Sequence, residues 1–160
     1  MLAVSKRLQA EERPLLRSYL CGAFVKNFSG QILRLHYHHL PFSFNAEGQP
    51  VLSYDSLADV KTLMDSEPGF WIRFCAGDKY FYWHSALGTL AARDVLSPQE
   101  KEIIGLWAHG KSITEIAAHF SVSINTVKNQ FNTARRRLLA RDNTALVQLC
   151  RMSGILDSVI

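Results

Sequence analysis

The chain has 160 residues, of which 48% are hydrophobic, and a net charge of +4. This composition is typical of a globular protein rather than a disordered one, and the length suits one domain or two small ones. No apolar run reaches the roughly 18–20 residues that a membrane span needs. The first residues lack the apolar block of a signal peptide, so we expect a cytoplasmic protein without membrane contact. The cysteines stand far apart in apolar stretches, which favours buried thiols.

The first half of the chain is patterned as helices followed by an antiparallel sheet. Residues 2–28 are predicted to be helical. Aromatic and apolar residues alternate over 31–44, which predicts a strand, and the turn-forming stretch 45–48 leads into a partner strand at 51–54. A further hairpin is predicted over 70–83. In the second half, helical periodicity replaces the alternating pattern of strands. The fold class expected for the chain is therefore α+β.

Three histidines in the first predicted strand raise the question of a metal site. His36 and His38 share one face of a strand and would supply two ligands, with His39 beside them. No Cys or acidic residue obviously completes a tetrahedral set, so these rings are expected on the surface or in the core. The chain also lacks a nucleophile elbow, a phosphate loop and an HExxH pattern. We therefore predict no catalytic residues, no metal, no cofactor and no enzyme activity.

The second half carries explicit helix-start signals. Ser97 is followed by Pro98 and Glu100, which supply a hydroxyl cap, a proline at the first helical position and a carboxylate three residues after the cap. Ser112 and Glu115 repeat this capping box for a second, short helix. A tight break then leads to a third helix, and a fourth follows it.

The third predicted helix, about 123–138, separates into two faces. Its apolar residues recur at core spacing: Val127, Phe131, Ala134 and Leu138. Its opposite face carries amide and cationic side chains: Asn125, Lys128, Asn129, Asn132, Arg135 and Arg136. No carboxylate occurs between Glu115 and Asp142, so positive charge dominates this element. Side chains of these types read base edges in the major groove of DNA.

Residues 96–156 resemble the LuxR-type helix-turn-helix family, whose DNA-binding domain has four helices. The resemblance rests on blocks in register: Leu96–Ile104, Gly110–Ala117, Val122–Asn129, Arg136–Leu138 and Thr144–Val147. It implies that DNA bases are contacted by Lys128, Asn129 and Asn132. The DNA backbone would be contacted by a second set: Ser112, Thr114, Thr126, Arg135 and Arg136.

The fourth helix of this family, here about 143–153, commonly forms a dimer surface. The resemblance implies a homodimer, with the surface made by four apolar residues: Leu146, Val147, Leu149 and Cys150. Three positions depart from the family pattern: Gln130, Leu139 and Asn143. Leu139 replaces the Gly that usually ends the third helix, so it would lengthen that helix or alter the turn after it.

The first half resembles, more loosely, the closing part of a PAS sensor domain, in which a helix precedes three antiparallel strands. We predict a partial PAS-like sensor or assembly domain over 1–85, a linker over 86–95 and the helix-turn-helix domain over 96–160. A small-molecule or protein signal at the first half would follow from this resemblance. A phosphorylated receiver domain is not expected there, because the alternation of strands and helices that it requires is missing.

Two functions remain open from the sequence. The first is a transcriptional regulator that binds double-stranded DNA as a dimer, with the third helix in the major groove. The second is a protein-interaction module or adaptor whose helix-turn-helix does not bind DNA. Its sheet would offer an aromatic patch: Phe70, Trp71, Tyr80, Tyr82 and Trp83. Exposure of these rings would favour the second function, and their burial would disfavour it.

Overall fold

The computed structural model describes residues 17–66, 68–76, 79–86, 88 and 90–157. They form two compact units. The sheet unit comprises the described residues up to Val60 together with Phe70–Asp94. The helical unit comprises Lys61–Gly69 together with the described residues from Val95 onward. The predicted α+β class is confirmed, since the strands come first and the helices follow.

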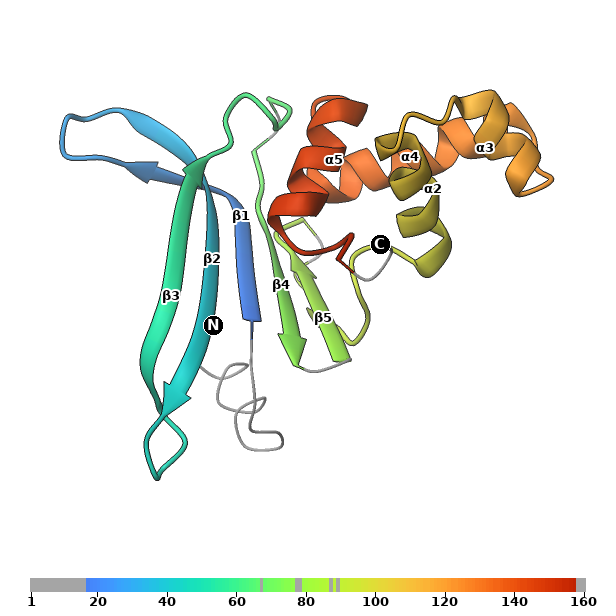
Figure 1. The fold of residues 1–160 in the computed structure, drawn as a ribbon. Helices are drawn as coiled ribbons and strands as arrows, with labels where there is room; N and C mark the ends of the chain where they lie inside the picture. Colours follow the sequence, from blue (N-terminus) through green and yellow to red (C-terminus); the bar gives the residue numbers. More distant parts are fainter. Residues whose placement is uncertain (1–16, 67, 77–78, 87, 89, 158–160) are drawn as a thin grey trace. The chain divides into compact units, whose positions relative to one another are not determined.

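The sheet unit is built on one antiparallel sheet. Its described strands are β1 (Arg17–Lys26), β2 (Ile32–Phe44), β3 (Pro50–Asp59), β4 (Trp71–Ala76), β5 (Lys79–His84) and β6 (Leu90–Ala91). They lie in the order β3-β2-β1-β4-β5-β6, and Figure 1 shows the first five side by side. The chain runs as a meander through β1, β2 and β3, and β4 then pairs with the free side of β1. Among the described strands, β3 is therefore an edge strand.

The segment at 17–26 is a strand, so the prediction of helix over 2–28 is wrong for this part; residues 2–16 lie outside the described residues. β1 occupies the interior of the sheet, between β2 and β4. Its most buried aromatic and thiol side chains, Tyr19 and Cys21, are 3% and 0% exposed and stand two residues apart, as strand geometry requires. The segment forms a strand despite its helical pattern because β1 pairs with β2 on one side and with β4 on the other. Local helix propensity is weak compared with such tertiary contacts.

The other sheet predictions are confirmed. β2 begins one residue after the start of the strand predicted over 31–44 and ends with it, and β3 extends the strand predicted at 51–54 in both directions. Gly48 has a φ of +78° in the turn between them, a left-handed conformation that Gly adopts without steric cost. β4 and β5 form the hairpin predicted over 70–83.

The helical unit contains the four predicted helices among its described residues: α2 (Pro98–Ala108), α3 (Ile113–His119), α4 (Ile124–Leu138) and α5 (Asn143–Met152). Both predicted capping boxes are confirmed. Ser97 and Ser112 accept from the backbone three residues on, and Glu100 and Glu115 bond back to the backbone of the cap. These bonds satisfy N–H groups that have no partner within a helix, which explains where α2 and α3 begin. None of the described helices is both long and apolar enough to cross a membrane.

α4 ends at Leu139, whose φ of +55° is left-handed. The departure from Gly therefore neither lengthens the helix nor removes the turn, because Leu itself takes the conformation that Gly would favour. A left-handed residue with a Cβ costs roughly 1–2 kcal/mol. The side chain of Leu139 is only 8% exposed, and its burial offsets that cost.

One segment that lies between two strands in the sequence belongs to the helical unit. This segment, Lys61–Gly69, follows β3 and precedes β4, and we call it the strap. Its Met64 is 3% exposed and pairs with Ala140 in an isolated antiparallel bridge. Two backbone hydrogen bonds of 2.9 Å flank the bridge, from Asp65 N–H to the Leu139 carbonyl and from Arg141 N–H to the Leu63 carbonyl. The strap thus lines the turn between α4 and α5, which the sequence did not predict.

Candidate DNA-binding interface

The inner face of α4 fixes this helix within the helical unit. Its four predicted core residues are each at most 2% exposed: Val127, Phe131, Ala134 and Leu138. Phe131 packs edge-on against Trp107 of α2, with ring centroids 6.0 Å apart. The helix begins at Ser123, whose hydroxyl accepts from the Thr126 N–H at 3.0 Å. A helix that is packed in this way presents its opposite face in one defined orientation.

The three side chains predicted to read bases are exposed on the outer face of α4. Lys128, Asn129 and Asn132 are all exposed, and positions 128 and 132 are one helical turn apart. Asn125 and Arg136 are exposed on the same helix. The arrangement that base reading needs is therefore present, and the role of each residue stays a prediction.

The residues predicted to contact the DNA backbone differ in exposure. Ser112, Thr114 and Arg136 are exposed, whereas Thr126 and Arg135 are half-buried. Two of the hydroxyls also stabilise helix starts. That of Ser112 accepts from Glu115 N–H at 3.2 Å, and that of Thr126 lies 2.8 Å from the hydroxyl of Ser123. A DNA contact by Thr126 would therefore share a hydroxyl that already has a partner.

The second half of α4 lines two surface cavities, of about 460 and 450 Å³. Asn132 and Arg135 line both of them, Lys128 lines the first, and Arg136 and Arg141 line the second. The Arg135 guanidinium donates to the amide oxygen of Asn132 through Nη2, while its buried Nε has no hydrogen-bond partner among the described residues. Each lining also contains one acid, Asp142 in the first cavity and Asp65 in the second, but cations outnumber acids in both. The excess of positive charge suits an anionic ligand such as a phosphate.

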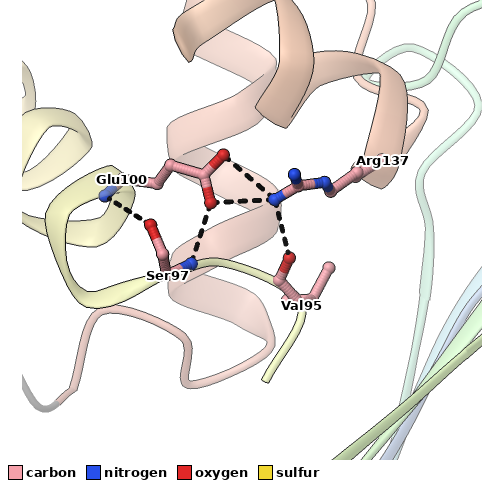
Figure 2. A network of polar contacts seen from close by, with 4 residues as sticks. All are labelled: Val95, Ser97, Glu100 and Arg137. Atoms are coloured by element: carbon pink, nitrogen blue, oxygen red, sulfur yellow. Dashed lines mark hydrogen bonds and ion pairs between the residues drawn. The ribbon is translucent and has the colours of Figure 1, made fainter. Parts of the chain in front are cut away.

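Arg137 points away from this outer face. Figure 2 shows its guanidinium between the Glu100 carboxylate and the Val95 carbonyl, with Nη1 at 2.8 and 3.0 Å from the two carboxylate oxygens and 3.4 Å from the carbonyl oxygen. The same carboxylate accepts from the Ser97 N–H at 2.8 Å. Arg137 therefore ties the end of α4 to the start of α2. Arg137 follows Ala134 by three residues and therefore lies beside the apolar face of α4. This spacing could have indicated from the sequence that Arg137 is not on the outer face.

The segment that carries these features matches a known family. Residues 94–150 match the family described as bacterial regulatory proteins, luxR family. Residues 94–150 are a LuxR-family domain. The resemblance predicted from the sequence is thereby confirmed for this part of the chain. No curated protein matches the chain.

Among solved structures, the chain is similar to proteins named VqmA. It is 14% identical to VqmA bound to DPO, covering 94% of this chain and 56% of that one with a TM-score of 0.36. A Vibrio cholerae VqmA dimer, grouped in its description with LuxR-type receptors, is 16% identical over 96% of this chain and 64% of that one, with a TM-score of 0.37. The chain thus spans 56–64% of the length of these two proteins.

Helix α5 of the LuxR-family domain does not expose the predicted dimer surface. The four side chains are buried, with exposed fractions of 0% for Leu146, Leu149 and Cys150 and 5% for Val147. The prediction that they form a surface is therefore wrong. It assumed too small a core, because Ile155 and Leu156 beyond α5 and Met64 of the strap are also buried in the helical unit.

The aromatic patch of the alternative function is not exposed. Trp71 and Tyr82 are 0% and 2% exposed, and Phe70, Tyr80 and Trp83 are half-buried. The protein-interaction alternative is therefore disfavoured in the form predicted. Exposed apolar side chains instead cluster on β3 and the end of β2, at 43–67% exposure, and we call them the edge patch: Phe42, Phe44, Val51, Leu52, Tyr54 and Leu57. The sequence analysis missed this patch because the edge position of β3 depends on strand order.

The histidines of β2 have protein partners. His36 is 3% exposed, and burial, with a smaller contribution from the neighbouring His38, lowers its pKa to about 4. The His38 ring stacks on Tyr19 with centroids 4.4 Å apart. His39 Nδ1 lies 2.7 Å from a carboxylate oxygen of Asp55. Each ring thus has a structural role, as expected for core and surface histidines.

Proposed function

We propose that the chain is a sequence-specific transcriptional regulator that binds double-stranded DNA through α4. The outer face of α4 carries the proposal, because it holds exposed amide and cationic side chains on a helix whose inner face is fully packed. The absence of a carboxylate between Glu115 and Asp142 leaves no acid on α4 itself to repel phosphates. A helix of this kind fits the major groove. The function is binding rather than catalysis, and we place it in the cytoplasm.

Within this proposal, the residues of the interface divide into two groups. Lys128 reads guanine, and Asn129 and Asn132 read adenine, through the donor and acceptor patterns of the base edges. Contacts to the sugar-phosphate backbone set the register and supply affinity without sequence information. They are assigned to Ser112, Thr114, Thr126, Arg135 and Arg136.

We also propose a homodimer, assembled through the edge patch rather than through α5. β3 is an edge strand among the described strands, and exposed apolar residues beside an open edge favour pairing with another strand. Two copies related by a two-fold axis would present two copies of α4 to two half-sites. The sheet unit then serves assembly, and it is also where a small-molecule or protein signal would act.

The DNA-binding proposal is tested with the full chain and a library of DNA fragments at several salt concentrations. Binding should weaken steeply as salt rises, because cations are released from the phosphates. Lys128→Ala should cost about 1–3 kcal/mol on preferred sites and little on other sites. Arg136→Ala should weaken binding to all fragments alike and reduce the salt slope by about one.

Arg151→Ala is the matched control, because it removes an exposed cation from α5 rather than from α4. It should leave both the affinity and the salt slope nearly unchanged. A wild-type chain that is folded by circular dichroism but binds no fragment at low salt would overturn the proposal.

A further inference from the structure

The strap brings a carboxylate to the end of α4 that faces DNA in the proposed function. Asp65 is half-buried and lines the 450 Å³ cavity together with Arg135, Arg136 and Arg141. Asn132 and Ala140 complete the lining. Among the described residues around this cavity, Asp65 is the only acid. Residues 116–141 contain none, so the chain supplies this negative charge from a remote part of its sequence.

The strap contacts the turn after α4 through its backbone. These contacts include the Met64–Ala140 bridge and its two flanking hydrogen bonds, beside the buried Met64 side chain. The hydrogen bonds within α4, and the bond from Ala140 N–H to the Arg135 carbonyl at 2.9 Å, do not involve the strap. Opening of the strap therefore leaves these hydrogen bonds of α4 intact, which is what local opening beside a folded helix requires.

We infer that the strap is a built-in competitor of DNA. When docked, it holds the Asp65 carboxylate in the cavity that a backbone phosphate enters, and bound DNA displaces it. The inference rests on the proposed function, because it assigns the phosphate contacts to Arg135 and Arg136. A carboxylate and a phosphate a few ångströms apart repel each other, and salt screens this repulsion only partly in a half-buried site.

The competition gives the sheet unit a route to the DNA-binding face. The strap continues at one end into Val60 and β3 and at the other into Phe70 and β4. A signal that shifts either strand pulls on the strap through the covalent chain. Because coupling between two sites is reciprocal, whatever loosens the strap tightens DNA binding, and DNA binding loosens the strap by the same factor.

The experiment compares the full-length wild type with Asp65→Asn, Asp65→Glu and Asp157→Asn in DNA binding. Asp65→Asn removes the charge and keeps the shape, so it should bind every DNA sequence about five- to tenfold more tightly, at the low end of the usual range of coupling between sites. Asp65→Glu restores the charge and should bind like the wild type. Asp157→Asn removes an exposed acid beyond α5 and controls for the change in net charge.

Hydrogen exchange at the backbone amides of Asp65 and Arg141 provides a second measurement. Both amides donate to backbone carbonyls in the docked strap, so they should exchange slowly in the free protein and faster when DNA is bound. Two results would overturn the inference that the strap competes with DNA, while leaving the proposed function intact. One is that the wild type binds DNA but Asp65→Asn gains no more affinity than Asp157→Asn. The other is that DNA slows exchange at these amides. If the folded wild type binds no DNA, both fail together.

Discussion

The two units of the molecule differ in the side chains that they expose and in how many charged or polar groups they bury. The helical unit buries apolar residues on the inner sides of its helices and exposes Lys128, Asn129, Asn132 and Arg136 of α4. The sheet unit instead buries Arg34, Arg73, His36 and His84. It also exposes large apolar residues along β3 and at Phe28, in the turn between β1 and β2. Each unit thus holds an internal ion pair, Arg137–Glu100 in the helical unit and Arg73–Asp94 in the sheet unit. The units differ in their surfaces, because the sheet unit exposes large apolar residues that are suited to contact with a partner.

The largest effect is expected at the buried ion pair of the sheet unit. Arg73 is 2% exposed, and its Nε and Nη2 lie 2.7 and 2.9 Å from the two carboxylate oxygens of Asp94. Asp94→Asn should lower the free energy of unfolding by about 3–5 kcal/mol, because it leaves a buried guanidinium without its counter-ion. Denaturant unfolding of the full chain measures the loss. Lys111→Gln breaks the exposed Lys111–Glu115 pair of the helical unit and should cost far less, and equal losses would refute the contrast.

Next in size is the pH dependence that arises from the buried histidine of β2. The pKa of His36 falls from 6.5 to about 4, chiefly because burial disfavours its charged form. The unfolded chain therefore takes up a proton between these values while the folded chain does not, so stability is full above pH 6.5 and falls as the pH drops towards 4. The loss from this group is about 3 kcal/mol. Unfolding curves at neutral and acidic pH should show a smaller drop for His36→Gln than for the wild type.

A smaller effect distinguishes the turn after α4 from an ordinary helix position. Leu139→Ala removes buried side-chain atoms and keeps the left-handed conformation at a residue with a Cβ. Leu139→Gly removes the same packing but relieves the steric cost, so it should be more stable than Leu139→Ala by about 1 kcal/mol. In the interior of a helix the order is the reverse. The melting temperatures of the two variants measure this difference. A higher melting temperature for Leu139→Ala would show that the turn is not strained.

The smallest effect on stability is expected at the edge patch. Leu57→Lys replaces a side chain that is 67% exposed, so it should change the free energy of unfolding by no more than about 0.5 kcal/mol. It should nevertheless shift the chain from dimer to monomer in sedimentation velocity, because a lysine at an edge opposes strand pairing. Leu90→Lys makes the same change at the opposite edge of the sheet and should leave the dimer intact. Dimers of equal strength in both variants would exclude β3 as the interface.

The sequence predicted most of the helical unit because its signals are local. A serine with an acid three residues later marks the starts of α2 and α3, and the spacing of apolar residues separates the two faces of α4. β1 was not predicted because its conformation is set by pairing with strands that follow it in the chain. The burial of α5 was missed for a related reason, since part of the same core comes from Met64 of the strap. Contacts between segments that are distant in sequence leave no periodic pattern in either one.

The strap also makes the helical unit, which carries the proposed DNA-binding face, discontinuous along the chain. A gene fragment that begins at residue 95 would encode all four described helices and still lack Lys61–Gly69. It would leave Ala140 without its bridge partner, and the carbonyl of Leu139 without the N–H of Asp65. Joining this domain to a different partner domain by a single crossover would therefore transfer an incomplete unit. The helical unit and the sheet unit would therefore be exchanged as one segment. A functional chimaera would need either two junctions or another segment in place of Lys61–Gly69.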